Sequence, residues 1–191
     1  EIGQLALTPK AVAALTKKIS HQLQQQAGPA LDALLLNDLR EQFGSAVDVG
    51  VLNGSGLLGQ PTGVRNTAGV GSVSGTSFGV TGALECQTDV AASKALMPGC
   101  GYVTTPTVAG LLMQRVRFAS TASPLWEGSL DAGQILGVQA MSTLNCPAST
   151  LFFGRWQSVV LADWGVLELV KDEATHFTTG EPRFRAILHV D

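Results

Sequence analysis

The sequence has few charged residues. Only 14% of its 191 residues are Asp, Glu, Lys or Arg, and the net charge is −3, whereas roughly a quarter of an average globular domain is charged. The deficit argues against a nucleic-acid-binding protein, because such proteins concentrate basic side chains on one face. Two interpretations stay open at this point. One is a subunit that buries neutral surface against copies of itself, and the other is a Gly/Ala-rich domain with long neutral loops.

Cysteines and long apolar runs are also scarce. The three cysteines, Cys86, Cys100 and Cys146, are odd in number, widely spaced and form no CxxC pair. A disulfide framework or a zinc site is therefore not expected, and reduced thiols are the default. No apolar run is long enough to span a membrane, so we expect no membrane partner.

A long amphipathic helix is the clearest predicted element. Pro29 suits a helix start, because its missing N–H leaves no helical bond unmade there. From Ala30 to about Leu52, apolar residues recur every four positions on one face. The recurring residues are Leu31, Leu35, Leu39, Phe43 and Val47, and the face is widened by Leu34, Leu36 and Ala46. The stretch 53–63, with four glycines and a proline, is expected to end the helix.

Shorter elements surround this helix. The patterns predict an extended arm or edge strand at Leu5–Ala14, which tolerates Pro9, and a short helix behind a Ser20 cap. Further helices are predicted at Val80–Leu96 and, opened by Pro106, at Thr107–Gln114, with a loop or hairpin at Arg115–Glu127. Strands are predicted at Gly101–Thr105, Gln134–Met141, Thr150–Phe153, Val166–Val170 and Arg183–Val190. Because strands and helices do not alternate regularly, the fold class is α+β and not a doubly wound sheet.

One motif suggests an enzyme. Gly75-Thr76-Ser77-Phe78-Gly79 matches G-x-S-x-G, the turn that carries the nucleophile of serine hydrolases. Asp163 and His176 follow in the order that a catalytic triad requires. However, no buried apolar strand precedes the motif, and a chain with 22 glycines produces such a pattern readily by chance. Ser77 is therefore predicted to be an ordinary loop or cap residue, and a serine hydrolase is the minor alternative.

Other patterns do not indicate a cofactor or a metal. The glycines at 54, 56 and 59 follow a helix, whereas phosphate-binding loops follow a strand, so nucleotide binding is rejected. The histidines lack ligand spacing, and the tryptophans lack basic neighbours and are predicted to be core or interface anchors. These residues are His21, His176 and His189, and Trp126, Trp156 and Trp164. We expect no catalytic residues, no cofactor and no metal.

The stretch from Ile19 to Val64 carries a recognisable series of features. A Ser, a leucine–glutamine pair, a long helix, an Asp near the helix end and a GSGLLGQPTG turn follow one another. They are Ser20, Leu23, Gln24, Asp48, and the turn Gly54, Ser55, Gly56, Gln60, Pro61, Thr62 and Gly63. Together they resemble the family of tailed-phage major capsid proteins, whose fold is shared with encapsulins.

The second half resembles the same family. Tyr102–Leu112 is similar to its strand–Pro–helix segment, and Ile135–Val138, followed by Gln139, is similar to one of its strands. Phe152–Trp156 resembles its FG-containing turn, with Arg155 in place of the usual acid, and Phe184–Asp191 resembles its closing strand. The resemblance therefore runs over nearly the whole chain.

The resemblance implies an α+β phage capsid fold of two domains. A peripheral domain would comprise residues 1–56, with a spine helix at 29–52, and a return strand at 174–191. An axial domain would comprise residues 57–173, with contacts near the capsomer axis at Arg115–Asp131. The resemblance also implies that the N-terminal arm and most of the extended loop lie outside this sequence, and we expect the chain alone to be monomeric or to form small oligomers.

The function implied is structural and not enzymatic. The resemblance predicts a subunit of a bacteriophage or prophage icosahedral capsid that self-assembles into pentamers and hexamers. Its location would be the virion, after synthesis in the bacterial host cytoplasm. Portal, scaffold or maturation protease are further candidate partners, and packaged DNA would be enclosed without sequence-specific binding. The alternative is the shell protein of an encapsulin-like nanocompartment.

Overall fold

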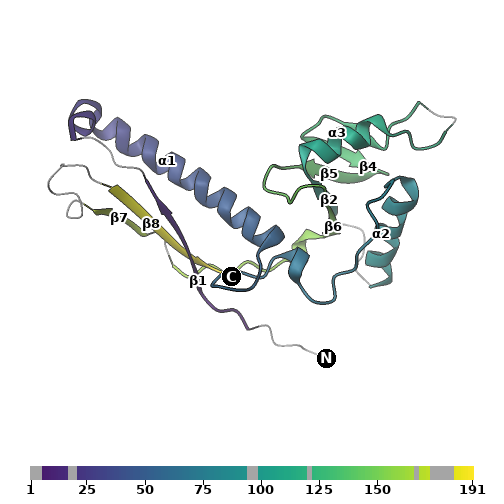
Figure 1. Ribbon diagram of the computed structural model, residues 1–191, viewed down its shortest axis with the longest axis horizontal. Coiled ribbons are helices and arrows are strands. Elements are labelled where there is room, and N and C mark those ends of the chain that lie inside the picture. Colours follow the sequence, from purple (N-terminus) through teal and green to yellow (C-terminus); the bar gives the residue numbers. More distant parts are fainter. Residues whose placement is uncertain (1–5, 17–20, 94–98, 120–121, 166–167, 173–182) are drawn as a thin grey trace. The chain divides into compact units, whose positions relative to one another are not determined.

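The computed structural model describes residues 6–16, 21–93, 99–119, 122–165, 168–172 and 183–191. The chain divides into two compact units, whose elements are labelled in Figure 1. The first unit comprises Glu1–Gly63 and Leu161–Asp191, and the second unit is the continuous stretch Val64–Val160. Residues 57–63 and 161–173, which the sequence-based boundaries give to an axial domain, belong to the first unit.

The first unit contains a three-stranded antiparallel sheet and one long helix. The sheet order is β1-β8-β7, with β1 at Lys10–Leu15, β8 at Arg183–Val190 and β7 at Glu168–Asp172. The helix α1, at His21–Asn53, lies along this sheet (Figure 1), where Leu39 and Phe43 pack with Ala186 into a small core. The predicted edge strand is confirmed in β1, which starts directly after Pro9, where a missing N–H does no harm.

The prediction that Pro29 opens the long helix is wrong. α1 begins at His21 and runs through Pro29 as one element of 33 residues, so the predicted short helix and the spine helix at 29–52 are continuous. Proline inside a helix removes one backbone hydrogen bond at a cost of about 3 kcal/mol. Cooperative helix formation on both sides of Pro29 outweighs that local cost. The end of the helix at the glycine-rich turn is confirmed, and Ser20 lies outside the described residues.

The buried stripe of α1 is narrower than predicted. Leu39 and Phe43 are buried, whereas Leu34 is 66% exposed and Ala46 is exposed as well. A single sheet of three strands covers only one stripe of a helix, so of the residues that widen the face Leu34 and Ala46 stay exposed and Leu36 is half-buried. The long helix therefore presents apolar side chains at its surface.

A five-stranded mixed sheet forms the centre of the second unit. Its order is β3-β4-β5-β2-β6, with β3 at Trp126–Gly128, β4 at Ala132–Ile135, β5 at Val138–Ser142, β2 at Cys100–Thr104 and β6 at Leu151–Arg155. β2 and β5 are parallel, and the other neighbours are antiparallel. β2 is the first strand of this sheet along the chain, but it lies inside the sheet between β5 and β6. The order of the strands in the sheet therefore depends on the tertiary fold and not on their order in the sequence.

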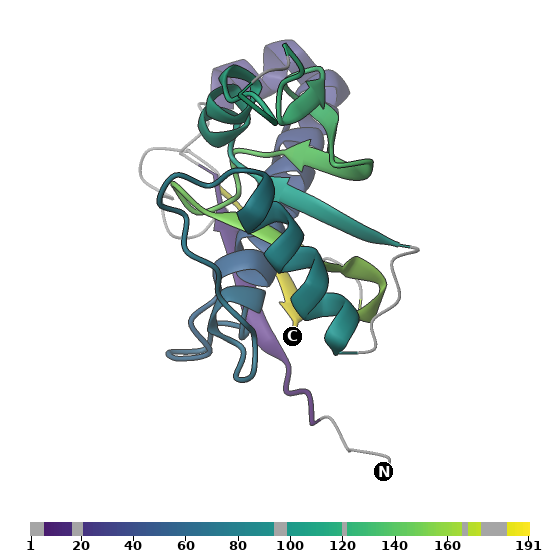
Figure 2. The ribbon, with the colours of Figure 1, turned by 90° about the vertical axis from the view of Figure 1, so that its right-hand side faces the viewer.

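Two helices cover one face of this sheet. α2 (Val80–Ala92) runs beside the sheet in Figure 2, and α3 (Pro106–Gln114) follows β2 directly. The side chains of Trp126, Tyr102 and Ile135 are fully buried against the two helices. α3 begins as predicted, with proline in its first turn and a Thr105 side chain that accepts a hydrogen bond from the backbone.

The predicted single strand Gln134–Met141 is a hairpin. β4 and β5 pair in antiparallel register around a turn at Leu136 and Gly137, whose φ angles are 51° and 80°. Positive φ at both central residues is the geometry of a tight two-residue hairpin turn. Leucine is rare at positive φ, so Leu136 gave no sign of a turn in the sequence. The alternating pattern of the segment therefore suggested one continuous strand.

The remaining boundaries shift by a few residues. α2 ends at Ala92, where the Ser93 N–H bonds to the Asp89 carbonyl at 3.1 Å, and its predicted continuation to Leu96 passes into residues outside the description. Two short 3-10 turns, η1 at Val64–Asn66 and η2 at Trp156–Ser158, were not predicted. Among the described helices, none is long and apolar enough to cross a membrane.

Candidate assembly surfaces

The structure places the G-x-S-x-G motif in a loop and not in a nucleophile turn. Ser77 is exposed and has a φ of 53°, a feature that a nucleophile turn shares. Residues 70–75 before it, however, form neither strand nor helix, whereas that turn joins a buried strand to a helix. The next residue, Phe78, packs against the core of the second unit. The turn therefore positions a core side chain at the start of α2.

The proposed triad partners of Ser77 lie in the other unit or outside the described residues. Asp163 belongs to the first unit, where it forms an isolated β-bridge with Val190, whereas Ser77 belongs to the second. Residue 176 lies outside the described part of the chain. Of the histidine side chains, the structure describes that of His189, which is exposed on β8.

Cys86 and Cys146 are protonated thiols near neutral pH. Burial raises the pKa of Cys146 to about 11, and burial together with the nearby carboxylates of Asp89 and Glu85 raises the pKa of Cys86. Only the thiolate acts as a nucleophile or a metal ligand, so neither residue is activated near neutral pH. The residues that the structure describes contain no group of three or more His, Cys, Asp or Glu side chains that could hold a metal ion.

The glycine-rich turn after α1 is a rigid projection. Backbone bonds close it at two levels, from the Gly56 N–H to the Pro61 carbonyl at 3.1 Å and from the Gly63 N–H to the Gly54 carbonyl at 2.9 Å. A side chain at Gly54 or Gly63 would overlap neighbouring backbone atoms. Leu58, at a φ of 53°, is fully exposed at the tip of the turn. The turn thus presents an apolar side chain on an ordered backbone.

The predicted loop or hairpin after α3 is a hairpin tied by several bonds. An isolated bridge joins Val116 to Pro124, and the Leu125 N–H donates to the Arg115 carbonyl at 2.7 Å. An ion pair joins Arg117 to Glu127 across it, with Nη2 and Oε2 separated by 3.2 Å. The hairpin lies within the segment Arg115–Asp131 that the resemblance assigns to axial contacts, and that assignment stays a prediction.

Two exposed apolar side chains stand on this hairpin. Phe118 is 59% exposed and Val116 is also exposed. Aromatic side chains are enriched at protein interfaces, so an exposed aromatic ring marks an interaction surface more often than an isolated exposed leucine does. We refer to Val116 and Phe118 together as the apolar tip.

The sheet of the second unit has a second, less covered face. Register pairs Val103 of β2 with Met141 of β5 and with Phe152 of β6, so these three side chains form one row on the face opposite Tyr102. Met141 is 61% exposed. The core helices α2 and α3 pack on the Tyr102 face, so this row lies away from them.

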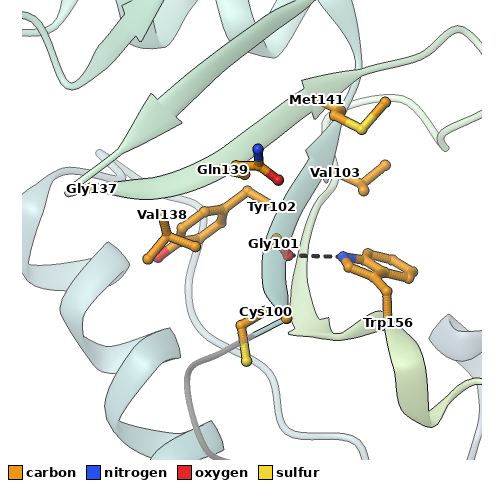
Figure 3. A pocket seen from close by; sticks show the side chains of 10 residues that line it. Cys100, Gly101, Tyr102, Val103, Gly137, Val138, Gln139, Met141 and Trp156 are labelled. Carbon is orange, nitrogen blue, oxygen red and sulfur yellow. Dashed lines mark hydrogen bonds between the residues drawn. The ribbon is translucent and has the colours of Figure 1, made fainter.

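An open depression of about 910 Å³ lies beside this row. Figure 3 shows Met141, Val103 and Trp156 on one side of β2, with the indole of Trp156 over Gly101. The indole N–H donates to the Gly101 carbonyl at 3.0 Å, and a Cβ at Gly101 would stand 3.5 Å from the ring. That spacing is ordinary van der Waals contact, so it is the hydrogen bond that holds Trp156 as one wall of the depression.

Sequence reasoning missed this depression. Trp126 is buried in the core as predicted, whereas Trp156 is half-buried and Trp164 is exposed, and an interface role for these two stays a prediction. The available signal was Gly101 within β2 and Trp156 directly after β6. Their proximity depends on the pairing of β2 with β6, which local sequence does not specify.

The chain is similar to known capsid proteins along its whole length. The profile of the phage capsid family matches residues 1–191. The major capsid protein of Halomonas phage phiHAP-1 is 29% identical over 192 residues, which cover 100% of this chain and 31% of that relative. The chain therefore spans about a third of the curated relative.

Solved structures show the same fold. The capsid of an empty GTA particle matches with a TM-score of 0.74 at 16% identity, and the capsid of a native GTA particle with 0.70 at 18% identity. Each match covers 95% of this chain and 67% of the solved chain. A chain from Mycobacterium phage Ogopogo matches with a TM-score of 0.63 at 15% identity, over 95% of this chain and 70% of its own. From its α+β fold and the family match over residues 1–191, this chain belongs to the phage capsid family.

Proposed function

We propose that this chain is the shell-forming part of a major capsid protein of a bacteriophage or prophage. Copies of the whole protein would assemble into pentamers and hexamers and then into an icosahedral shell around the genome. The observation that carries the proposal is the family match over all 191 residues. The relative from Halomonas phage phiHAP-1 is itself a major capsid protein, and the solved neighbours include capsids of GTA particles computed with C5 symmetry. These relatives favour a virus-like shell over an encapsulin-like compartment.

The surface chemistry supports self-association. Shell subunits form many moderate contacts, and neutral apolar surfaces reduce the cost of removing water from each contact. The exposed Leu58 on the glycine-rich turn, the apolar tip and the depression beside Trp156 are surfaces of this kind. Rings of five or six copies need contacts between two different patches of the same subunit, and several such patches are available.

The two units have different proposed roles. The first unit, with the long helix α1, is the candidate for the peripheral domain. The second unit, with the tied hairpin at 115–127, is the candidate for the axial domain, whose loops meet around a capsomer axis. In this proposal the family's N-terminal arm and extended loop are supplied by sequence beyond this chain.

The proposed protein is structural and catalyses no reaction. Its partners are copies of itself, and portal, scaffold and maturation protease are candidates for further contacts in the virion. Packaged DNA would be enclosed without sequence-specific binding, which is consistent with a net charge of −3. Synthesis would take place in the bacterial host cytoplasm and the final location would be the virion.

Negative-stain electron microscopy of the whole protein that carries this chain tests the proposal. We expect shells or capsomer rings from the whole protein, and monomers or small oligomers from residues 1–191 alone. A whole protein that stays a compact monomer over a range of salt and pH would contradict the proposal. Reaction of the Ser77 hydroxyl with a fluorophosphonate probe would then be the next measurement, because it would support the hydrolase alternative.

A further inference from the structure

The second unit carries two apolar surfaces, one of which lies along β2. The depression beside Trp156 includes the first residues of that strand, from Cys100 to Val103. The apolar tip stands on the hairpin that follows α3, and α3 begins directly after the other end of β2. The two surfaces share no residue, and they differ in form, because one is a pair of exposed side chains and the other is a hollow.

The depression is uncharged, and the apolar tip is flanked by two arginines, of which exposed Arg115 donates to the Phe78 carbonyl. None of the ten residues that line the depression carries a charge. The one charged side chain between Val116 and Phe118 is Arg117, and its guanidinium is paired with Glu127 within the same hairpin. A charged tip would lose hydration on entering an uncharged depression, whereas an apolar tip gains free energy there. The uncharged depression thus matches the apolar side chains of Val116 and Phe118.

Both surfaces are also held in place before any contact is made. The hairpin is closed by the Leu125–Arg115 backbone bond and the Val116–Pro124 bridge. The wall of the depression is held by the hydrogen bond from Trp156 to Gly101. Ordered surfaces lose little conformational entropy on binding, which favours association between them.

We propose that the apolar tip of one copy inserts into the depression of the next copy around a capsomer ring. The occupant of the depression is thus a second copy of this chain, and the contact joins two different patches, as closure by rotation requires. Phe118 would lie against Met141 and Trp156 of its neighbour. The inference rests on the proposed function, and it names the surfaces through which the second units associate.

A charge-exchange experiment in the whole protein tests this contact. Phe118→Glu and Met141→Lys each place a charge in an apolar contact, and both positions are exposed enough for the fold to tolerate the change. We expect each single variant to lower the yield of sedimenting shells about tenfold or more, because a buried unpaired charge opposes the contact. The double variant pairs the two charges at every contact of the ring, so we expect it to recover assembly.

Leu84→Glu is the matched control. Leu84 is 48% exposed on α2 and lies in neither surface. We expect this variant to assemble like the wild type, which would separate the effect of position from the effect of adding a charge. Circular dichroism and a thermal melt of each variant check that the subunit is folded.

The outcomes distinguish this inference from the proposed function. Shells from the wild type together with normal shells from both single variants would overturn the inference and leave the proposed function standing. Loss in the single variants without recovery in the double variant would overturn the pairing of the two surfaces, as would an equal loss with Leu84→Glu. A wild-type protein that forms no rings or shells would overturn both proposals.

Discussion

The two units of this chain are stabilised in different ways. In the second unit, eight buried side chains form one cluster that includes Trp126 and Tyr102. They come from two helices, four strands and the residue before β3. Among the described residues of the first unit, the corresponding cluster contains three buried residues, Leu39, Phe43 and Ala186, with four partly buried side chains packed against it. Backbone pairing carries more of the order in the first unit, where six consecutive residues of β1 are in register with β8.

This difference shows how stability and surface are shared within one subunit. A unit with a large packed core maintains its loops without external help, as the hairpin at 115–127 requires. A unit with a small core leaves apolar side chains such as Leu34 exposed and gains more from contacts with other chains. The predictions below test whether side-chain packing dominates in the second unit and backbone geometry in the first.

The largest expected effect comes from removing an aromatic ring from either core. Trp126→Ala should destabilise the second unit by about 3–5 kcal/mol, because the side chain is fully buried and its indole N–H bonds to the Ser129 carbonyl at 2.8 Å. Hydrogen exchange followed by mass spectrometry should show lost protection within residues 64–160. The amides of β1 and β8 should keep most of their protection.

Phe43→Ala is the matched change in the first unit. It should cost about 3 kcal/mol and lower the protection of β1 and β8, since Phe43 is one of the few side chains that hold α1 to the sheet. An equal loss of protection in both units after either substitution would show that the two units unfold as one, and the comparison would then fail.

Two glycines of the first unit should respond to alanine with opposite signs. Gly54→Ala should destabilise by about 1–3 kcal/mol, because the new methyl group would overlap the Pro61 carbonyl in the turn. Gly44→Ala should stabilise by about 1 kcal/mol, because Gly44 is exposed within α1 and nothing lies within 4 Å of the added Cβ. Urea denaturation measures both, and effects of the same sign would contradict the role given to backbone geometry.

The smallest expected effect concerns the end of β8. The hydrogen bond from Lys10, with a second from the Thr8 N–H, holds the pKa of Asp191 below its ordinary value of 3.8. A carboxylate whose pKa is lowered in the folded state stabilises the fold at pH values above its unfolded pKa. This stabilisation is lost as the pH falls through the folded pKa. Asp191→Asn should therefore cost less than about 1 kcal/mol near neutral pH, as a pair near the surface does.

The pH dependence supplies the control for this last prediction. Thermal melts of wild type and Asp191→Asn should differ at about pH 7, and the difference should shrink as the pH falls through the lowered pKa of the folded state. A difference that persists unchanged at the acidic end would show that Asp191 acts through packing and not through its charge. The ion pair between Lys10 and Asp191 would then contribute nothing measurable to the stability of the first unit.

Several elements could be predicted because their signals are local. Pro106 marks the start of α3, the glycines after Asn53 mark the end of α1, and alternation in Arg183–Val190 marks β8. Each of these signals is a restriction on φ or a repeat along one segment of the chain. The errors at Pro29 and at Gln134–Met141 arose where the surrounding structure outweighed the local preference.

The candidate surfaces were predicted less completely. The segment Arg115–Asp131 was named from the resemblance, but the ion pair between Arg117 and Glu127 that ties its hairpin was not. The depression was missed altogether, because Met141, Val103 and Trp156 come from three distant parts of the sequence. Their proximity follows from the sheet order β5-β2-β6, which depends on which strands find each other during folding.

The sequence by itself determined the α+β class, most of the helices and strands, and the membership in a capsid family, because these depend on local backbone preferences and on an ordered series of motifs. Only the tertiary structure decided which residues of α1 are buried, that Ser77 stands in a loop without a preceding strand, and that Trp156 forms the wall of a depression over Gly101. The physical reason is that burial and proximity are properties of pairs of residues far apart in the chain. Such pairs are selected by packing between elements, on which the pattern within any one element carries little information.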